Sequence, residues 1–174
     1  MNKQTTRINY DKVAIVGTSG TGKSFLVKTA DPLTTGIINS ERQPFPFRIK
    51  TPLKYEGKPK TWAAFIKNLK DYSENTDIKN IIIDSQTMAL DMLIRESSNN
   101  FKGFDIYKQY NKCVYEYLDL LKSIQKDVIV TSHSKTALIE GYKQRCMTSH
   151  GQEFGDGKIE RHFVCVLYSG KSMV

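Results

Sequence analysis

The sequence predicts an α/β fold, in which a doubly wound, mainly parallel sheet carries helices on both faces. Two observations lead to this prediction. Short apolar runs that end in polar residues alternate with longer stretches whose apolar residues recur every three or four positions, as buried parallel strands alternate with helices. The chain has 174 residues, of which 39% are hydrophobic and 25% charged, so we expect residues 1–174 to form a single domain with a sizeable core.

The first strand leads into the most specific motif of the chain. The run Val-Ala-Ile-Val precedes Gly-Thr-Ser-Gly-Thr-Gly-Lys-Ser at 17–24, and a helical pattern follows. Gly17 and Gly22 permit backbone angles at which consecutive N–H groups turn inward around a polyphosphate, and the following helix directs its positive end toward the same oxygens. Lys23 would reach the terminal phosphates and the Ser24 hydroxyl would bind Mg²⁺. The residues expected around a bound nucleotide are Gly17, Thr18, Ser19, Gly20, Thr21, Gly22, Lys23, Ser24 and Phe25.

A second apolar run ends in an acidic residue. Residues 78–84 read Ile-Lys-Asn-Ile-Ile-Ile-Asp, which is typical of a strand buried on both faces. Asp84 would lie at the carboxyl end of this strand, where ligands bind in open α/β sheets, and would hold Mg²⁺ directly or through water together with Ser24. The alternative is that Asp84 caps the helix expected after residues 85–87.

Periodicity and helix-breaking residues place the other elements. Thr61 can cap a helix, whereas four prolines interrupt residues 43–60, where we expect a surface excursion with at most a short hairpin. In chain order, the expected strands lie at 13–16, 35–39, 78–84, 127–131 and 162–168, the expected helices at about 61–73, after 85–87 and at 107–125, and the expected loops at 95–104 and 134–158.

The charge of the chain narrows the classes of partner. A formal net charge of +8 and a sequence pI near 9.3 favour polyanions, of which nucleic acid is the commonest inside cells. A solvated basic surface without any such partner is the alternative. No apolar run approaches the roughly 20 residues that cross a bilayer, and the first twelve residues are polar. We therefore expect a cytoplasmic protein with no membrane partner.

The cysteines favour reduced thiols. Cys113, Cys146 and Cys165 are odd in number and lack paired spacing, unlike a disulfide framework. Cys146 and His150, followed by His162 and Cys165, could make a four-ligand zinc site. Against this, Cys165 lies within an apolar run, where a thiol usually packs as a small core side chain.

Several segments together resemble the RecA-type core ATPases, and more closely the compact phage-encoded nucleotide-binding proteins of single-strand annealing and recombination. The resemblance spans most of residues 12–135. Its segments are GTSGTGKS at 17–24, IINSE at 37–41, IKNIIIDS at 78–85, FDIYKQYNKCVYEYLDLL at 104–121 and DVIVTSHSK at 127–135. The resemblance implies a RecA-like P-loop NTPase fold, with ATP and Mg²⁺ as cofactors and the host cytoplasm as the location.

Two further catalytic residues accompany this resemblance. Hydrolysis needs a group that orients or deprotonates the attacking water, usually a carboxylate. In many related ATPases an acid follows the metal-site aspartate, but here that position is Ser85. Glu41, at the end of another strand, is the available replacement and matches the acid of RecA-like proteins, while His133 matches the γ-phosphate sensor. The alternatives are an exposed charge at Glu41 and a histidine at position 133 that caps the strand end.

The resemblance also implies contact with single-stranded DNA through residues 95–104 and 134–150. The residue types there suit this role, because cations can contact phosphates and aromatic rings can stack on bases. The candidate phosphate contacts are Lys102, Lys135, Lys143 and Arg145, and the candidate stacking residues are Phe101, Phe104 and Tyr142. Ordinary polar loops are the alternative. The resemblance allows a second copy of the chain and a single-strand-binding protein as further partners.

The function expected from the sequence is therefore ATP binding and hydrolysis by a RecA-like protein that acts on single-stranded DNA. The first alternative is a non-hydrolysing annealing or adaptor module in which ATP only orders the loops. The second is a small P-loop kinase, which would use Lys23 and Asp84 but also needs an acceptor pocket and an arginine-rich lid, and no such lid is visible in the sequence.

Overall fold

A central sheet organises the chain in the computed structural model, which describes residues 10–170. Its strands follow the order β3-β2-β4-β5-β1-β7, all paired in parallel, and β6 pairs antiparallel with the far half of β5. The strands are β1 (Lys12–Gly17), β2 (Thr35–Asn39), β3 (Tyr55–Gly57), β4 (Asn80–Asp84), β5 (Asp127–Ile139), β6 (Tyr142–Met147) and β7 (Cys165–Tyr168).

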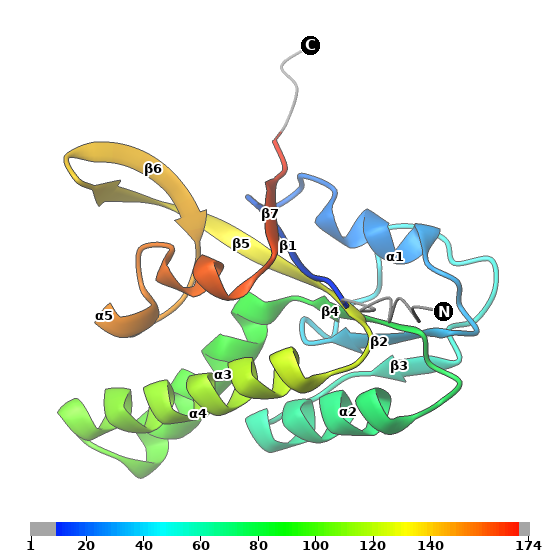
Figure 1. Ribbon diagram of the computed structural model, residues 1–174, viewed down its shortest axis with the longest axis horizontal. Coiled ribbons are helices and arrows are strands. Elements are labelled where there is room, and N and C mark those ends of the chain that lie inside the picture. The colour runs from blue at the N-terminus through cyan, green and yellow to red at the C-terminus, as the bar shows by residue number, and fades with distance from the viewer. Residues whose placement is uncertain (1–9, 171–174) are drawn as a thin grey trace, which may run out of the picture.

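Helices cover both faces of this sheet (Figure 1). The helices α2, α3 and α4 lie on one face, and α1 lies on the other. The helical elements are η1 (Lys23–Phe25), α1 (Leu26–Thr29), α2 (Trp62–Glu74), α3 (Gln86–Asn100), α4 (Phe104–Ser123), α5 (Gly151–Phe154) and η2 (Lys158–His162). The predicted fold class, a mainly parallel α/β sheet between helices, is confirmed.

The three consecutive isoleucines of β4 explain why both faces need cover. Ile81 and Ile83 belong to the large core under α2, α3 and α4, whereas Ile82 belongs to the smaller core beneath α1. Successive strand residues point to opposite faces, so this strand supplies apolar side chains to both cores. In the larger core, the rings of Trp62 and Tyr117 both lie within 6 Å of the Phe65 ring.

The prediction of a loop at 95–104 is wrong for most of its length. Helix α3 continues to Asn100 and α4 begins at Phe104, so only three residues connect them. The buried face of α3 continues through Leu93 to Ser97. Because a serine takes the next contact position in place of a larger apolar residue, the apolar periodicity ends one turn before the helix does.

The prediction of a loop at 134–158 is also wrong. Strand β5 continues to Ile139, and β6 returns alongside it to form a hairpin, with α5 and η2 after it. The two turn residues, Glu140 and Gly141, have positive φ angles of 50° and 83°. A two-residue hairpin turn with two positive φ angles has a backbone twist that matches the twist of the strands it joins. Glutamate is an unusual residue at the first of these positions, so the sequence carries a weak turn signal.

Two smaller differences concern the edges of the sheet. The last strand begins at Cys165 instead of residue 162, because residues 158–162 form η2. Within residues 43–60, β3 pairs in parallel with β2, so this excursion adds a strand to the sheet and forms no hairpin. The helix expected at 61–73 is α2, and the Thr61 side chain accepts a hydrogen bond from the Ala64 N–H at 3.2 Å, as expected of its cap.

Two findings concern membrane spans and metal-binding clusters. Within residues 10–170, no helix is both long and apolar enough to cross a bilayer. Over the same range, no three His, Cys, Asp or Glu side chains are grouped to hold a metal ion, which includes the four residues of the zinc alternative. Of these, Cys146 is buried and Cys165 exposed, so the thiol that the sequence placed in the core lies on the surface.

The aromatic cluster predicts a large difference between two phenylalanines. Replacement of the fully buried Phe65 by alanine removes a ring packed among other rings, so we expect a loss of about 3–5 kcal/mol in the free energy of unfolding. Phe104 is 74% exposed, and Phe104→Ala should change that free energy by no more than about 0.5 kcal/mol. Urea denaturation of both variants is the measurement. Similar losses in the two variants would contradict this assignment of the core.

Candidate active site

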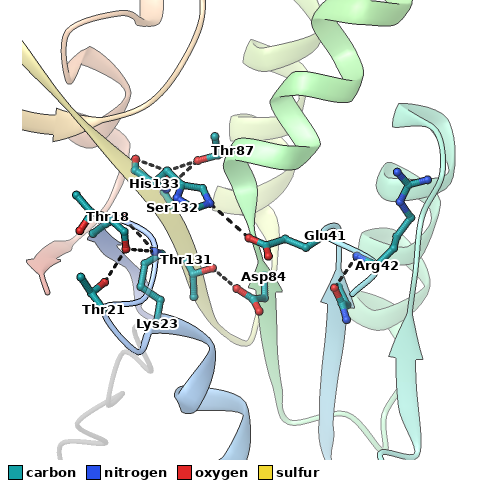
Figure 2. A network of polar contacts seen from close by, with 12 residues as sticks. Thr18, Thr21, Lys23, Glu41, Arg42, Asp84, Thr87, Thr131, Ser132 and His133 are labelled. Carbon is teal, nitrogen blue, oxygen red and sulfur yellow. Dashed lines mark hydrogen bonds and ion pairs between the residues drawn. The ribbon is translucent and has the colours of Figure 1, made fainter. Parts of the chain in front are cut away.

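The glycine-rich loop between β1 and η1 folds around the lysine that follows it. The Nζ of Lys23 donates hydrogen bonds to the carbonyl oxygens of Gly17 at 3.0 Å and Thr18 at 2.9 Å (Figure 2). Burial lowers the pKa of Lys23, while the nearby charges of Glu41 and Asp84 act against that shift. Gly22 lies at φ 81°, a backbone angle that favours glycine. The loop is therefore already curved around the ammonium group.

The helical segment after this loop is short. It consists of η1 and α1, which together cover residues 23–29. Because a short helix has a small dipole, the loop N–H groups and Lys23 are the stronger candidates to bind an anion.

The end of β7 supports the loop from the side, a contact that the sequence analysis missed. The Ser169 N–H donates to the Val16 carbonyl at 2.8 Å, and the Ser169 and Thr21 hydroxyls lie 2.8 Å apart. A Cβ atom at Gly17 would lie 2.1 Å from the Ser169 Oγ. Glycine is therefore needed at position 17 so that Ser169 can approach the loop backbone. No pattern in the sequence marks Ser169, because the contact spans the whole chain.

Asp84 lies at the carboxyl end of β4, as predicted, and is nearly buried. Its Oδ1 accepts a hydrogen bond from the Thr131 hydroxyl at 2.5 Å (Figure 2). Burial raises the pKa of Asp84, and the hydroxyls of Thr131 and Ser24 oppose that shift. The Ser24 hydroxyl thus lies beside this carboxylate, and the two groups form an oxygen donor set of the kind that Mg²⁺ prefers. The alternative role of Asp84, as a helix cap, is not seen, since Ser85 occupies the position before α3.

Glu41, in the turn after β2, and His133, on β5, come together at the edge of the sheet. The His133 Nε2 lies 3.4 Å from the Glu41 Oε1, and each side chain is about one-third exposed. The hydrogen bond from His133 lowers the pKa of Glu41, and burial only partly counteracts it. Glu41 is therefore a carboxylate at neutral pH, accessible to solvent and held in place by the imidazole.

The backbone of His133 is fixed by the start of α3. Its N–H donates to the Thr87 Oγ1 at 2.9 Å, and the Thr87 and Ser132 hydroxyls lie 2.9 Å apart (Figure 2). These contacts connect the first turn of α3 to the point where β5 leaves the parallel sheet. Thr87 and Thr131 are two functional neighbours that the sequence analysis did not assign, because a buried threonine has no distinctive spacing.

Part of the phosphate loop, Glu41 and His133 line one pocket of about 370 Å³ at the carboxyl edge of the sheet. Asp84 is buried and does not line this pocket, although its neighbour Ser24 does. The lining residues are Ser19, Gly20, Gly22, Lys23, Ser24, Phe25, Glu41, Pro46 and His133. The sequence singled out all of these except Pro46.

The four basic residues expected to contact DNA lie in two places. Lys102 lies in the connection between α3 and α4, whereas Lys135, Lys143 and Arg145 lie on the β5–β6 hairpin. The register pairs Leu138 with Lys143 and Ile139 with Tyr142.

The alternation of the hairpin strands separates these residues by face. Side chains alternate along a strand, and directly paired residues share a face. Lys143 and Arg145 therefore lie on one face, and Lys135 and Tyr142 lie on the other. Lys135 is also paired with Asp156, at 3.2 Å.

The family of the chain follows from sequence comparison. Residues 9–170 match the AAA_24 family, described as an AAA domain. The chain belongs to this AAA domain family. The match covers the phosphate loop and all of the strands and helices above, so the AAA domain is a P-loop protein of the AAA ATPase type. No functionally curated protein matches the chain.

The Glu41–His133 contact predicts a measurable shift in titration. Because His133 lowers the pKa of Glu41, His133→Ala should raise that pKa toward the ordinary glutamate value. In the folded wild type, the contribution of the contact to stability is present above the unfolded-state pKa of glutamate and is lost as the pH falls through the lower folded-state pKa. Carboxyl-detected NMR titration is the measurement.

A second histidine provides the control for this titration. His150→Ala removes a comparable contact, in which the His150 Nε2 lies 2.6 Å from the Asp91 Oδ1, and should leave Glu41 unchanged. An unchanged pKa of Glu41 in His133→Ala would contradict the contact.

Proposed function

We propose that the AAA domain binds ATP with Mg²⁺ at this pocket, hydrolyses it, and acts on single-stranded DNA in phage recombination or annealing. The observation that carries the proposal is the meeting of Lys23, Glu41 and His133 in one pocket, although they come from η1, from the turn after β2 and from β5. This combination places a cation for phosphate, a carboxylate for water and a histidine in contact with that carboxylate at one edge of the sheet.

Lys23 and the loop N–H groups would hold the phosphates. The Lys23 ammonium group donates hydrogen bonds to two loop carbonyls. A phosphate oxygen is a stronger partner for an ammonium ion than a neutral carbonyl, so bound triphosphate would draw Lys23 out of these contacts. The negative charge of the phosphates would also oppose the lowering of the Lys23 pKa that burial causes.

Ser24 and Asp84 would hold Mg²⁺, which would shield the charge that builds on the phosphates. The fit rests on the hydroxyl beside a nearly buried carboxylate. The raised pKa of Asp84 favours its neutral form, and the Thr131 hydrogen bond counters this by stabilising the carboxylate. Thr131 would therefore act as a positioning residue, whose hydrogen bond holds the Asp84 carboxylate and favours its ionised form.

Glu41 would activate the attacking water. The water oxygen forms a bond to the γ-phosphorus, the bond from that phosphorus to the bridging oxygen of ADP breaks, and Glu41 accepts the proton of the water. The hydrogen bond from His133 keeps Glu41 deprotonated and oriented before the reaction. Since the same histidine begins the segment that leads to the hairpin, occupancy of the γ-phosphate position can bias the hairpin.

The hairpin would supply the DNA contacts. It projects beyond the sheet on the side of its carboxyl edge (Figure 1), and Leu138, Lys143 and Arg145 lie exposed on one of its faces. The cations could contact the phosphates of single-stranded DNA, and the apolar side chain beside them could contact its bases. Arg145 also donates to the Ser169 carbonyl at 2.8 Å, which connects this face to the phosphate loop.

The catalytic assignment predicts different losses for two variants. Glu41→Gln should keep the ATP affinity near that of wild type but lower turnover about a hundredfold or more, because the amide cannot accept the proton. Lys23→Ala should lose most ATP binding, whereas Lys70→Ala, which removes an exposed lysine of α2, should lose none. Phosphate release and equilibrium ATP binding are measured on each variant. Unchanged turnover in Glu41→Gln would return Glu41 to the status of an ordinary surface charge, and wild-type protein that binds ATP without releasing phosphate would favour the non-hydrolysing adaptor.

The DNA assignment predicts a contrast between two neighbouring residues. Lys143→Ala should reduce the slope of log affinity against log salt for single-stranded DNA by about 0.7, the value for one phosphate contact. Tyr142→Ala, on the opposite face, should leave the slope unchanged. Fluorescence anisotropy with labelled oligonucleotide, with and without ATP, is the measurement. A loss in Tyr142→Ala alone would assign the DNA to the other face, and binding that ignores both salt and ATP would contradict the proposal.

A further inference from the structure

The pocket that contains the phosphate loop has an apolar rim that phosphate binding does not use. Phe25 follows the last residue of the loop motif and remains 48% exposed, although it lines the same pocket as Lys23 and Ser24. Pro46 is exposed on the same pocket. A large exposed apolar side chain beside a strongly polar cavity has a cost in water, and contact with an apolar part of the ligand would remove that cost.

The excursion between β2 and β3 holds this rim rigidly. The Phe25 ring lies 5.0 Å from the Phe47 ring at 48°, and Phe47 stacks on Phe45 at 5.5 Å and 21°. Phe45 and Phe47 are half-buried and pack on the small core beneath α1. Because they turn inward, the residue between them, Pro46, turns outward to the pocket. Pro46 thus places a stiff apolar ring at the mouth of the site.

The ligand that fits has a polyphosphate at one end and a flat, uncharged ring at the other. Lys23 and Ser24 mark the phosphate end, and Phe25 is the next residue along the chain. Flat rings stack on aromatic side chains in a manner that tolerates different bases, since every base has a π-face. The Lys28 ammonium group lies 5.5 Å from the centre of the Phe25 ring. This cation–π contact is one interaction that the Phe25 ring already makes.

We propose that Phe25 and Pro46, supported by Phe47, form a platform that binds the nucleobase. The platform supplies a contact that a free triphosphate cannot make. This inference rests on the proposed nucleotide site and deepens it, because it assigns the base end of the ligand to residues outside the phosphate loop.

The experiment compares two ligands on the same protein. Isothermal titration calorimetry measures the affinity for Mg-ATP and for Mg-tripolyphosphate in the wild type and in Phe25→Ala. Loss of one stacked ring should weaken ATP binding about tenfold and leave tripolyphosphate binding unchanged. Phe25→Trp, which keeps a flat ring, should retain the ATP affinity, and Pro46→Gly should reduce ATP affinity alone. Leu33→Ala truncates an exposed apolar side chain outside this pocket and should change neither affinity.

The alternative outcomes separate the platform from the phosphate site. Equal losses for both ligands in Phe25→Ala would show that the ring acts through the shape of the phosphate loop, and would overturn the platform. Unchanged ATP affinity in both Phe25→Ala and Pro46→Gly would also overturn it. Wild-type protein that binds both ligands with equal affinity would overturn the base contact but leave the phosphate site intact, whereas binding of neither would overturn the proposed function together with this inference.

Discussion

The parallel register of the central strands is the constraint on which the site depends. Gly17 on β1 is paired with His133 on β5, and Asn39 on β2 is paired with Asp84 on β4. The Ser40 N–H then donates to the Asp84 carbonyl at 2.7 Å, which continues the alignment to the residue before Glu41. A slip of one residue in any pair would turn alternate side chains to the wrong face. The buried isoleucines and valines therefore fix the positions of polar residues that they never touch.

The same edge of the sheet gives two carboxylates different properties. Asp84 is nearly buried and its pKa is raised, while Glu41 is partly exposed and its pKa is lowered by His133. Each carboxylate also influences Lys23. Burial alone would raise the pKa of both acids. The hydroxyl of Thr131 and the imidazole of His133 each lower the pKa of the carboxylate that they contact. The two carboxylates of this edge therefore differ in how readily they hold a proton, Asp84 more readily and Glu41 less.

The sequence was sufficient for the parts of the structure with strong local signals. The fold class, the phosphate loop and the location of Asp84 at a strand end follow from glycine spacing and from apolar runs. The hairpin was missed because a glutamate occupies its first turn position, and the end of α3 was missed because a serine continues its buried face. Thr131, Ser169 and Pro46 could not be found from local pattern, since each acts through partners distant in the chain. Their roles depend on the fold as a whole.

The contact between the end of β7 and the phosphate loop has a consequence for how the protein is made. Strand β1 lies between β5 and β7, so both of its neighbours are synthesised long after it. The Ser169 hydroxyl and the Val16 carbonyl that it contacts are separated by 153 residues. On the ribosome, the nucleotide motif therefore emerges well before its supporting strand. A nascent chain that stops before β7 would carry the whole motif without the framework that shapes it, so competence to bind nucleotide would be acquired only once β7 has joined the sheet.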